Sequence, residues 1–270
     1  MSRIGETFAR LPREGRRGFI PFVTAGDPDI GTTVELIVEL AHAGADIIEL
    51  GVPFSDPVAD GPVIQRASER ALRNGIGVAD VLSAVTEARR ATDAAIVLFS
   101  YFNPLMQFGL ERLGGEARRA GVDGVLVTDL VPEEAAELAD ILAREGLDEI
   151  FLVAPTSTDA RLQMVAERAS GFIYAVSRAG VTGARTELSA EAERLVTRVR
   201  ACSTLPVAVG FGVTNREQVT EVWRYADAAV VGSAIVAEIE KHASERVGRT
   251  ELVRRVGEFA RSLLPETTKI

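Results

Sequence analysis

Short apolar runs alternate with longer amphipathic stretches along almost the whole chain, and this alternation constrains the fold more than any other feature. Near-continuous apolar strands are typical of a parallel sheet that is buried on both faces. Eight such strand–helix units favour closure into a (β/α)8 (TIM) barrel over an open sheet. The predicted strands are residues 19–23, 46–50, 95–100, 124–128, 149–153, 172–176, 207–210 and 228–231.

Helical spacing of apolar residues marks the segments between these strands. The predicted helices are residues 32–43, 63–74, 78–90, 109–120, 132–145, 159–169, 189–201, 215–224 and 234–244. We expect Thr158, Ser189 and Thr214 to cap the helices that follow them. Extra helices are predicted at the N-terminus (residues 3–10), after the second strand and at the C-terminus (residues 251–264). A chain of 270 residues without a linker suits one barrel domain over residues 1–270.

Composition excludes several classes of protein. The net charge of −9, without any run of Lys and Arg, argues against nucleic acid as the main partner. No apolar run approaches the roughly 18 residues of a membrane span, so we expect no membrane association. The single cysteine, Cys202, cannot form an internal disulfide and fits a reducing compartment. We therefore expect a cytoplasmic protein.

Scarce lysine and histidine restrict the chemistry. Lys241 and Lys269 are the only lysines, and neither lies on a predicted strand, where a Schiff-base lysine would be needed. His42 and His242 lie on separate polar stretches and cannot build a His-rich metal site, so no metal is expected. Carbon–carbon bond chemistry would have to use carboxylates, backbone donors and the electronics of the substrate.

Residues 46–62, Asp-Ile-Ile-Glu-Leu-Gly-Val-Pro-Phe-Ser-Asp-Pro-Val-Ala-Asp-Gly-Pro, carry the strongest functional signal. Glu49 lies inside an apolar strand, where a carboxylate is costly unless it is paired or protonated. The proline-rich loop that follows can return Asp60 to the same barrel mouth, where active sites of such barrels lie. Carboxylates in different surroundings can serve as acid and base. The alternatives are a structural ion pair for Glu49 and ordinary turn chemistry for Asp60.

Glycine-rich segments follow the last three predicted strands, at residues 177–183, 210–213 and 232–234. Glycines let backbone N–H groups approach an anion, and a helix N-terminus favours negative charge. Phosphate sites in barrels recur after strands 7 and 8, so we predict one here, with Ser233 as a hydroxyl donor. Turn chemistry is the alternative. Phe22 and Tyr174 either pack in the core or face a flat apolar substrate.

These motifs closely resemble the tryptophan synthase α subunit family. The matching segments are residues 21–28, 49–62, 177–183, 210–212 and 232–235, which follow one another in order along nearly the whole chain. The resemblance implies cleavage of indole-3-glycerol phosphate to indole and glyceraldehyde 3-phosphate in tryptophan biosynthesis. It also implies that Glu49 and Asp60 form the catalytic acid/base pair of this retro-aldol reaction.

The resemblance implies further roles. The residues around the substrate would be Phe22, Tyr174, Thr182, Gly183, Phe211, Gly212, Gly232 and Ser233, with Thr182 on a lid that reaches Asp60. The partner would be a β subunit that uses pyridoxal phosphate, in an α2β2 heterotetramer contacted near Asp56, Asn103 and Pro104. No cofactor would belong to this chain itself.

Three other functions stay open at the level of sequence. The chain could be a lyase that works without a partner, a barrel isomerase of sugar phosphates, or a non-catalytic activator of a β subunit. The paired carboxylates argue against the isomerase. The presence of both Glu49 and Asp60 argues against a pure activator, because activation alone does not require them.

Overall fold

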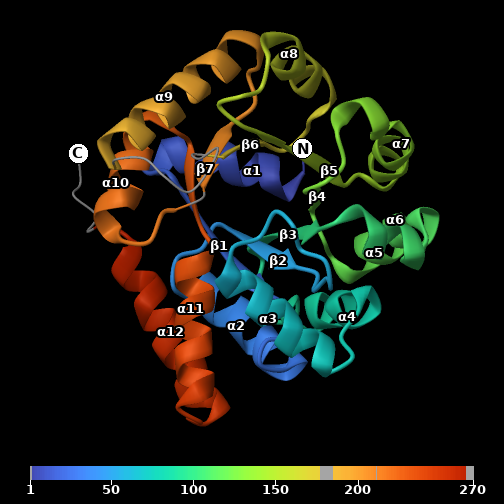
Figure 1. The fold of residues 1–270 in the computed structure, drawn as a ribbon, viewed down its shortest axis with the longest axis vertical. Helices are drawn as coiled ribbons and strands as arrows, with labels where there is room; N and C mark the ends of the chain where they lie inside the picture. The colour runs from blue at the N-terminus through green and yellow to red at the C-terminus, as the bar shows by residue number, and fades with distance from the viewer. Residues whose placement is uncertain (1, 177–184, 211, 266–270) are drawn as a thin grey trace.

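The computed structural model describes residues 2–176, 185–210 and 212–265, within which eight parallel strands close into a barrel (Figure 1). Each strand pairs with the next, and the last pairs with the first. The predicted (β/α)8 barrel is therefore confirmed. The strands are β1 (Gly18–Thr24), β2 (Ile47–Gly51), β3 (Ala95–Ser100), β4 (Gly124–Val127), β5 (Asp148–Val153), β6 (Ile173–Val176), β7 (Val207–Gly210) and β8 (Ala228–Val231).

Helices surround the strands, and the three expected additions are present (Figure 1). α1 precedes the barrel, two helices instead of one connect β2 to β3, and α12 follows α11 at the C-terminus. The helices are α1 (Arg3–Arg10), α2 (Ile30–His42), α3 (Pro62–Arg73), α4 (Val78–Ala88), α5 (Phe102–Phe108), α6 (Leu110–Ala120), α7 (Ala136–Glu145), α8 (Asp159–Arg168), α9 (Arg185–Cys202), α10 (Arg216–Tyr225), α11 (Ser233–Ser244) and α12 (Arg249–Leu263). Within the described ranges, none of them is both long and apolar enough to cross a membrane.

The helix predictions were wrong in a few local details. α5 was missed, because it has only seven residues and carries Pro104 within its first turn, where proline is tolerated. The predicted helix 132–145 is split into a 3-10 turn, η2 (Pro132–Glu134), and α7. Thr158 caps α8 as predicted, by accepting from the Arg161 N–H. Asn215, rather than Thr214, caps α10. Ser189 is not a cap, because α9 begins at Arg185.

The barrel interior is closed at the N-terminal ends of the strands. Ile4 and Phe8 of α1 belong to the same apolar cluster as the inward-facing strand residues, and the rings of Phe8 and Phe172 lie 5.7 Å apart. Both Ile4 and Phe172 are fully buried. Because this end is filled, the barrel can receive a ligand only at the C-terminal ends of its strands.

A chain of ion pairs fixes the two helices that flank this open end. Arg70 of α3 binds the buried carboxylate of Asp27, in the loop after β1, through two hydrogen bonds of 2.7 and 2.9 Å. The same guanidinium contacts Glu240 of α11 at 2.7 Å, and Arg66 of α3 also binds Glu240. Since α3 begins beside Asp60 and α11 begins at Ser233, these pairs set the spacing of two predicted site elements.

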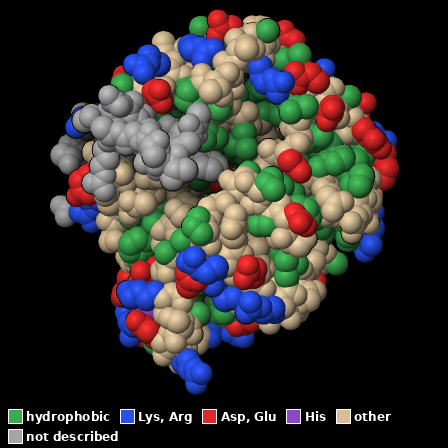
Figure 2. Space-filling view, viewed as in Figure 1, with side chains coloured by type: hydrophobic (Ala, Val, Ile, Leu, Met, Phe, Trp, Pro, Cys, Tyr) green, Lys and Arg blue, Asp and Glu red, His purple; other side chains and the backbone are tan. Residues whose placement is uncertain are grey.

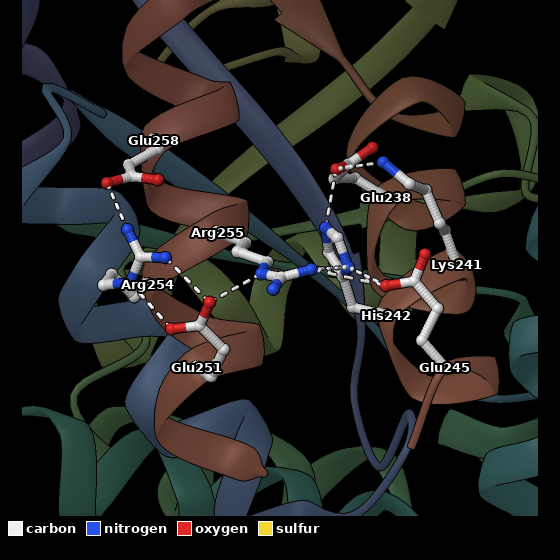
Figure 3. A network of polar contacts seen from close by, with 8 residues as sticks. All are labelled: Glu238, Lys241, His242, Glu245, Glu251, Arg254, Arg255 and Glu258. Atoms are coloured by element: carbon white, nitrogen blue, oxygen red, sulfur yellow. Dashed lines mark hydrogen bonds and ion pairs between the residues drawn. The ribbon is translucent and has the colours of Figure 1, made fainter. Parts of the chain in front are cut away.

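A second polar network braces α11 against α12 (Figure 3). The buried ring of His242 lies between two carboxylates, with Nε2 2.7 Å from Glu238 and Nδ1 2.9 Å from Glu245. Arg255 of α12 approaches Glu245 at 3.4 Å and donates from Nε to Glu251 at 2.6 Å. Arg255 therefore links α12 to the C-terminal end of α11, the helix whose N-terminal end faces the barrel mouth.

We expect Arg70→Met to lower the free energy of unfolding by about 3 kcal/mol, because it leaves the Asp27 carboxylate buried without its partner. Arg73→Met is the matched control on the same helix. Its side chain is 76% exposed and forms one long ion pair, of 3.6 Å, so its loss should cost less than about 0.5 kcal/mol. Urea unfolding of both variants measures the difference, and equal losses would contradict the anchoring role of Arg70.

Candidate active site

A cavity of about 550 Å³ opens at the C-terminal ends of the strands. Its described lining brings together both predicted catalytic carboxylates and five of the eight predicted substrate residues. The lining residues are Phe22, Glu49, Ala59, Asp60, Gly61, Pro62, Val63, Ile64, Phe99, Tyr174, Gly212, Val230, Gly232 and Ser233. The predicted Thr182, Gly183 and Phe211 lie outside the described residues.

Glu49 lies on β2, between Phe22 of β1 and Val97 of β3 in the sheet register. Its side chain is 1% exposed, and its Oε1 atom has no hydrogen-bond partner among the described residues. Burial raises the pKa of Glu49 to about 8, so the group holds a proton at neutral pH. The described part of the chain offers no cation for the structural ion pair considered above.

Asp60 lies on the loop between β2 and α3, in a less enclosed setting. Its N–H donates to the Pro57 carbonyl at 3.0 Å, and Gln65 Nε2 donates to its carbonyl at 2.9 Å. Burial raises the pKa of Asp60 to about 6, while a hydrogen bond from the Tyr101 hydroxyl opposes part of that rise. At neutral pH the pair is therefore one protonated acid and one carboxylate, as acid/base catalysis requires.

The wall beside Glu49 is aromatic. The rings of Phe22 and Phe99 lie 5.3 Å apart, edge to face, and Tyr174 lines the same cavity. A Cβ atom at Gly51 would lie 2.5 Å from the Phe22 ring, so glycine there makes room for that ring. Phe99 was not singled out from the sequence, although the alternation of residues along its strand could have placed it facing inward.

The opposite wall can receive an anion. Ser233 is the first residue of α11, and the first N–H groups of a helix have no partner within it. Gly212 lies in the loop after β7 with φ of 93°, a conformation that favours glycine. None of the described lining residues is Lys or Arg. An anion here would be bound by backbone N–H groups and a hydroxyl rather than by a cation.

The predicted partner-contact residues lie near this mouth. Asp56 is exposed on the same loop as Asp60, and Asn103 and Pro104 lie half-buried on α5. Two exposed apolar side chains lie beside them in sequence, Val58 (87% exposed) and Met106 (53% exposed). On the face seen in Figure 2, acidic and basic side chains are interspersed around the rim, without a large patch of one sign.

Metal binding finds no support in the described ranges. No group of three or more His, Cys, Asp and Glu side chains is arranged there to hold a metal ion. His242 is instead enclosed by Glu238 and Glu245, as described above.

We expect Glu49→Gln to stabilise the protein increasingly as the pH rises. The folded-state pKa of Glu49 lies above its unfolded value, so ionisation of the unfolded chain lowers wild-type stability between about pH 4.5 and pH 8. Glutamine does not ionise. The gain should be on the order of 3 kcal/mol near pH 7. Urea unfolding near pH 5 and near pH 8 measures this gain, with Glu137→Gln, at an exposed position, as the control. A difference in free energy of unfolding between Glu49→Gln and wild type that does not change with pH would contradict the buried, protonated state.

The comparisons with known proteins all match this chain to one family. The family described as "Tryptophan synthase alpha chain" matches residues 8–263. The tryptophan synthase alpha chain of Geobacter sulfurreducens is 50% identical over 249 residues, covering 92% of this chain and 94% of that protein. That of Leptothrix cholodnii is 51% identical over 248 residues, covering 92% of each.

Solved structures give the same result. Tryptophan synthase subunit alpha from Legionella pneumophila superposes with a TM-score of 0.88 at 36% identity, covering 97% of both chains. A chain of tryptophan synthase from M. tuberculosis, in an aminoacrylate-bound form, superposes with a TM-score of 0.85 at 37% identity. That match covers 97% of this chain and 100% of the other.

Proposed function

Because this chain belongs to the tryptophan synthase alpha chain family, we propose that Glu49 and Asp60 perform the reaction of that family in this cavity. The family reaction is the cleavage of indole-3-glycerol phosphate to indole and glyceraldehyde 3-phosphate, a lyase step of tryptophan biosynthesis. The observation that carries the residue assignment is the buried Glu49 carboxyl group, whose Oε1 has no hydrogen-bond partner among the described residues, in the same cavity as the more exposed Asp60.

The proposed chemistry uses the two different protonation states. Protonated Glu49 gives its proton to C3 of the indole, which makes the ring an electron sink. Ionised Asp60 accepts a hydrogen bond from the indole N–H and stabilises the positive charge. The bond from C3 to the glycerol carbon then breaks, its electron pair returns to the ring, and the hydroxyl proton passes to Glu49. Glu49 thereby regains its proton for the next cycle, and no Schiff-base lysine is needed.

The two walls of the cavity would hold the two ends of the substrate. Phe22 and Tyr174 would enclose the flat indole, since aromatic rings pack well against one another. Gly212, Gly232 and Ser233 would bind the phosphate at the start of α11. Thr182, Gly183 and Phe211 complete the proposed substrate contacts by family resemblance alone.

The family pairs with a β subunit, and we propose an α2β2 assembly for this chain. The exposed Val58 and Met106, with Asp56, Asn103 and Pro104, support a contact surface beside the mouth. Pyridoxal phosphate would belong to the β partner, and the α family carries no cofactor of its own. A cytoplasmic location and one domain over residues 1–270 complete the proposal.

We expect wild-type protein to release indole from indole-3-glycerol phosphate, and Glu49→Gln and Asp60→Asn to lose at least about a hundredfold in kcat, because each removes a proton-transfer or charge-stabilising group. Glu137→Gln, exposed on α7, is the matched control and should keep wild-type activity. Indole formation followed by absorbance measures the rates. Unchanged kcat in Glu49→Gln would refute its catalytic role.

We also expect a tryptophan synthase β subunit to co-elute with this chain in gel filtration and to increase its indole formation several-fold, because partner contact at the mouth can order site loops. Asp56→Lys reverses a charge on the proposed contact surface and should weaken co-elution. Matched replacement of the distant, exposed Glu137 by Lys should not. Full activity without any β subunit, and no co-elution, would favour a lyase that works alone.

A further inference from the structure

An ion pair joins the two helices whose first residues line the cavity. Arg66 of α3 donates from Nε and Nη2 to the two carboxylate oxygens of Glu240 on α11, and both hydrogen bonds are 2.7 Å long. A guanidinium that binds a carboxylate at two points fixes the direction of approach as well as the distance. Neither residue is among the described lining residues, so the pair must act on a ligand through its helices.

The apolar contact between α3 and α11 does not by itself fix how the helices lie along one another. Ala67 of α3 and Val236 of α11 are fully buried in one cluster. Nearer the mouth, Ile64 Cδ1 lies 3.9 Å from the place that a Cβ atom would take at Gly232. Apolar contact is non-directional, so it holds the helices together but restrains their sliding only weakly. The ion pair supplies the direction that this contact lacks.

Glu240 also ties both helices to the loop after β1. It accepts a further hydrogen bond of 2.7 Å from Arg70, whose guanidinium binds the buried carboxylate of Asp27 in that loop. Hydrogen bonds from Arg66 lower the pKa of Glu240 to about 2, and Arg70 adds to this effect. The Glu240 carboxylate is therefore charged throughout the neutral pH range, and both arginines hold it in place.

We propose that Arg66 and Glu240 are positioning residues for the phosphate end of the substrate, because their ion pair holds the start of α11, with Ser233, in place across the cavity from Asp60. The proposal rests on the proposed function and extends it. Glu240 lies about two helical turns after Ser233, and Arg66 lies about one turn after the start of α3. A shift at the pair would thus reach the lining end of each helix.

This role makes a kinetic prediction that a general structural role does not make. The phosphate group is remote from the bond that breaks, so its contacts are the same in the ground state and in the transition state. Loss of such uniform binding raises KM and leaves kcat unchanged. A general loosening of the barrel would instead reduce the amount of working enzyme and lower kcat.

Arg66→Met tests the proposal, because it removes the ion pair and keeps most of the side chain. We expect KM for indole formation to rise about threefold to fivefold, with kcat within about 1.5-fold of wild type. Calorimetric titration of the full chain should show weaker binding of glycerol 3-phosphate by a similar factor, and unchanged binding of indole.

Glu240→Gln should change KM in the same direction and by more, because it also weakens the contact with Arg70. The double variant Arg66→Met/Glu240→Gln should match Glu240→Gln alone, since Arg66 acts through Glu240. Near-ultraviolet circular dichroism checks that each variant is folded. Should Glu240→Gln not fold, Arg66→Met decides the question, because its side chain is half-exposed and tolerates replacement.

Arg73→Met is the matched control on the same helix. The ion pair of Arg73 with Glu69 stays within α3, so its loss leaves the contact with α11 intact. Both KM and the affinity for glycerol 3-phosphate should equal the wild-type values.

The outcomes separate this proposal from the one on which it rests. Unchanged KM in Arg66→Met and Glu240→Gln, or a loss confined to kcat, would overturn the positioning role. If wild-type protein forms no indole even with a β subunit, the proposed function fails. Weaker binding of glycerol 3-phosphate in Arg66→Met, but not in Arg73→Met, would still support the positioning of an anion site. Wild-type protein that does not bind glycerol 3-phosphate would overturn both proposals.

Discussion

The rest of the site depends on the burial of the Glu49 carboxyl group, whose Oε1 atom finds no hydrogen-bond partner in the described part of the chain. The group is enclosed by strands on both sides and by an aromatic wall, so water cannot stabilise its charge. It therefore keeps its proton at a pH where an ordinary glutamate has lost it. The closed sheet and the plug formed by α1 supply the rigidity and stability that offset this local cost.

The second carboxylate differs because it belongs to a loop and not to a strand. Burial raises the pKa of Asp60 less than that of Glu49, and the Tyr101 hydroxyl opposes part of that rise. The loop of Asp60 turns back across Phe54 and Ala59 onto Tyr101. The same loop exposes Asp56 and Val58 to the surroundings of the mouth. A partner bound to those side chains would thus contact the segment that positions one half of the acid/base pair.

Sequence alone predicted the barrel and the meeting of Glu49 with Asp60, because strand periodicity and the rule that active sites lie at strand ends are local signals. It missed α5, whose seven residues are too few to show periodicity around Pro104. It also missed the contact between the Ala59 N–H and the Tyr101 hydroxyl, since that contact depends on the path of a loop from one strand over the end of the next. No spacing in the sequence encodes that path.

The need to keep Glu49 protonated also limits how the site can hold an anion. A lysine or arginine in the cavity would bind phosphate strongly, but its charge would also favour ionised Glu49 and remove the proton that the reaction needs. The described lining instead offers the start of α11, Ser233 and Gly212. Helix N–H groups attract an anion through partial charges that fall off within about one turn. An acid with a raised pKa and a phosphate group can therefore share one cavity, which explains why a chain with a net charge of −9 needs no basic cluster here.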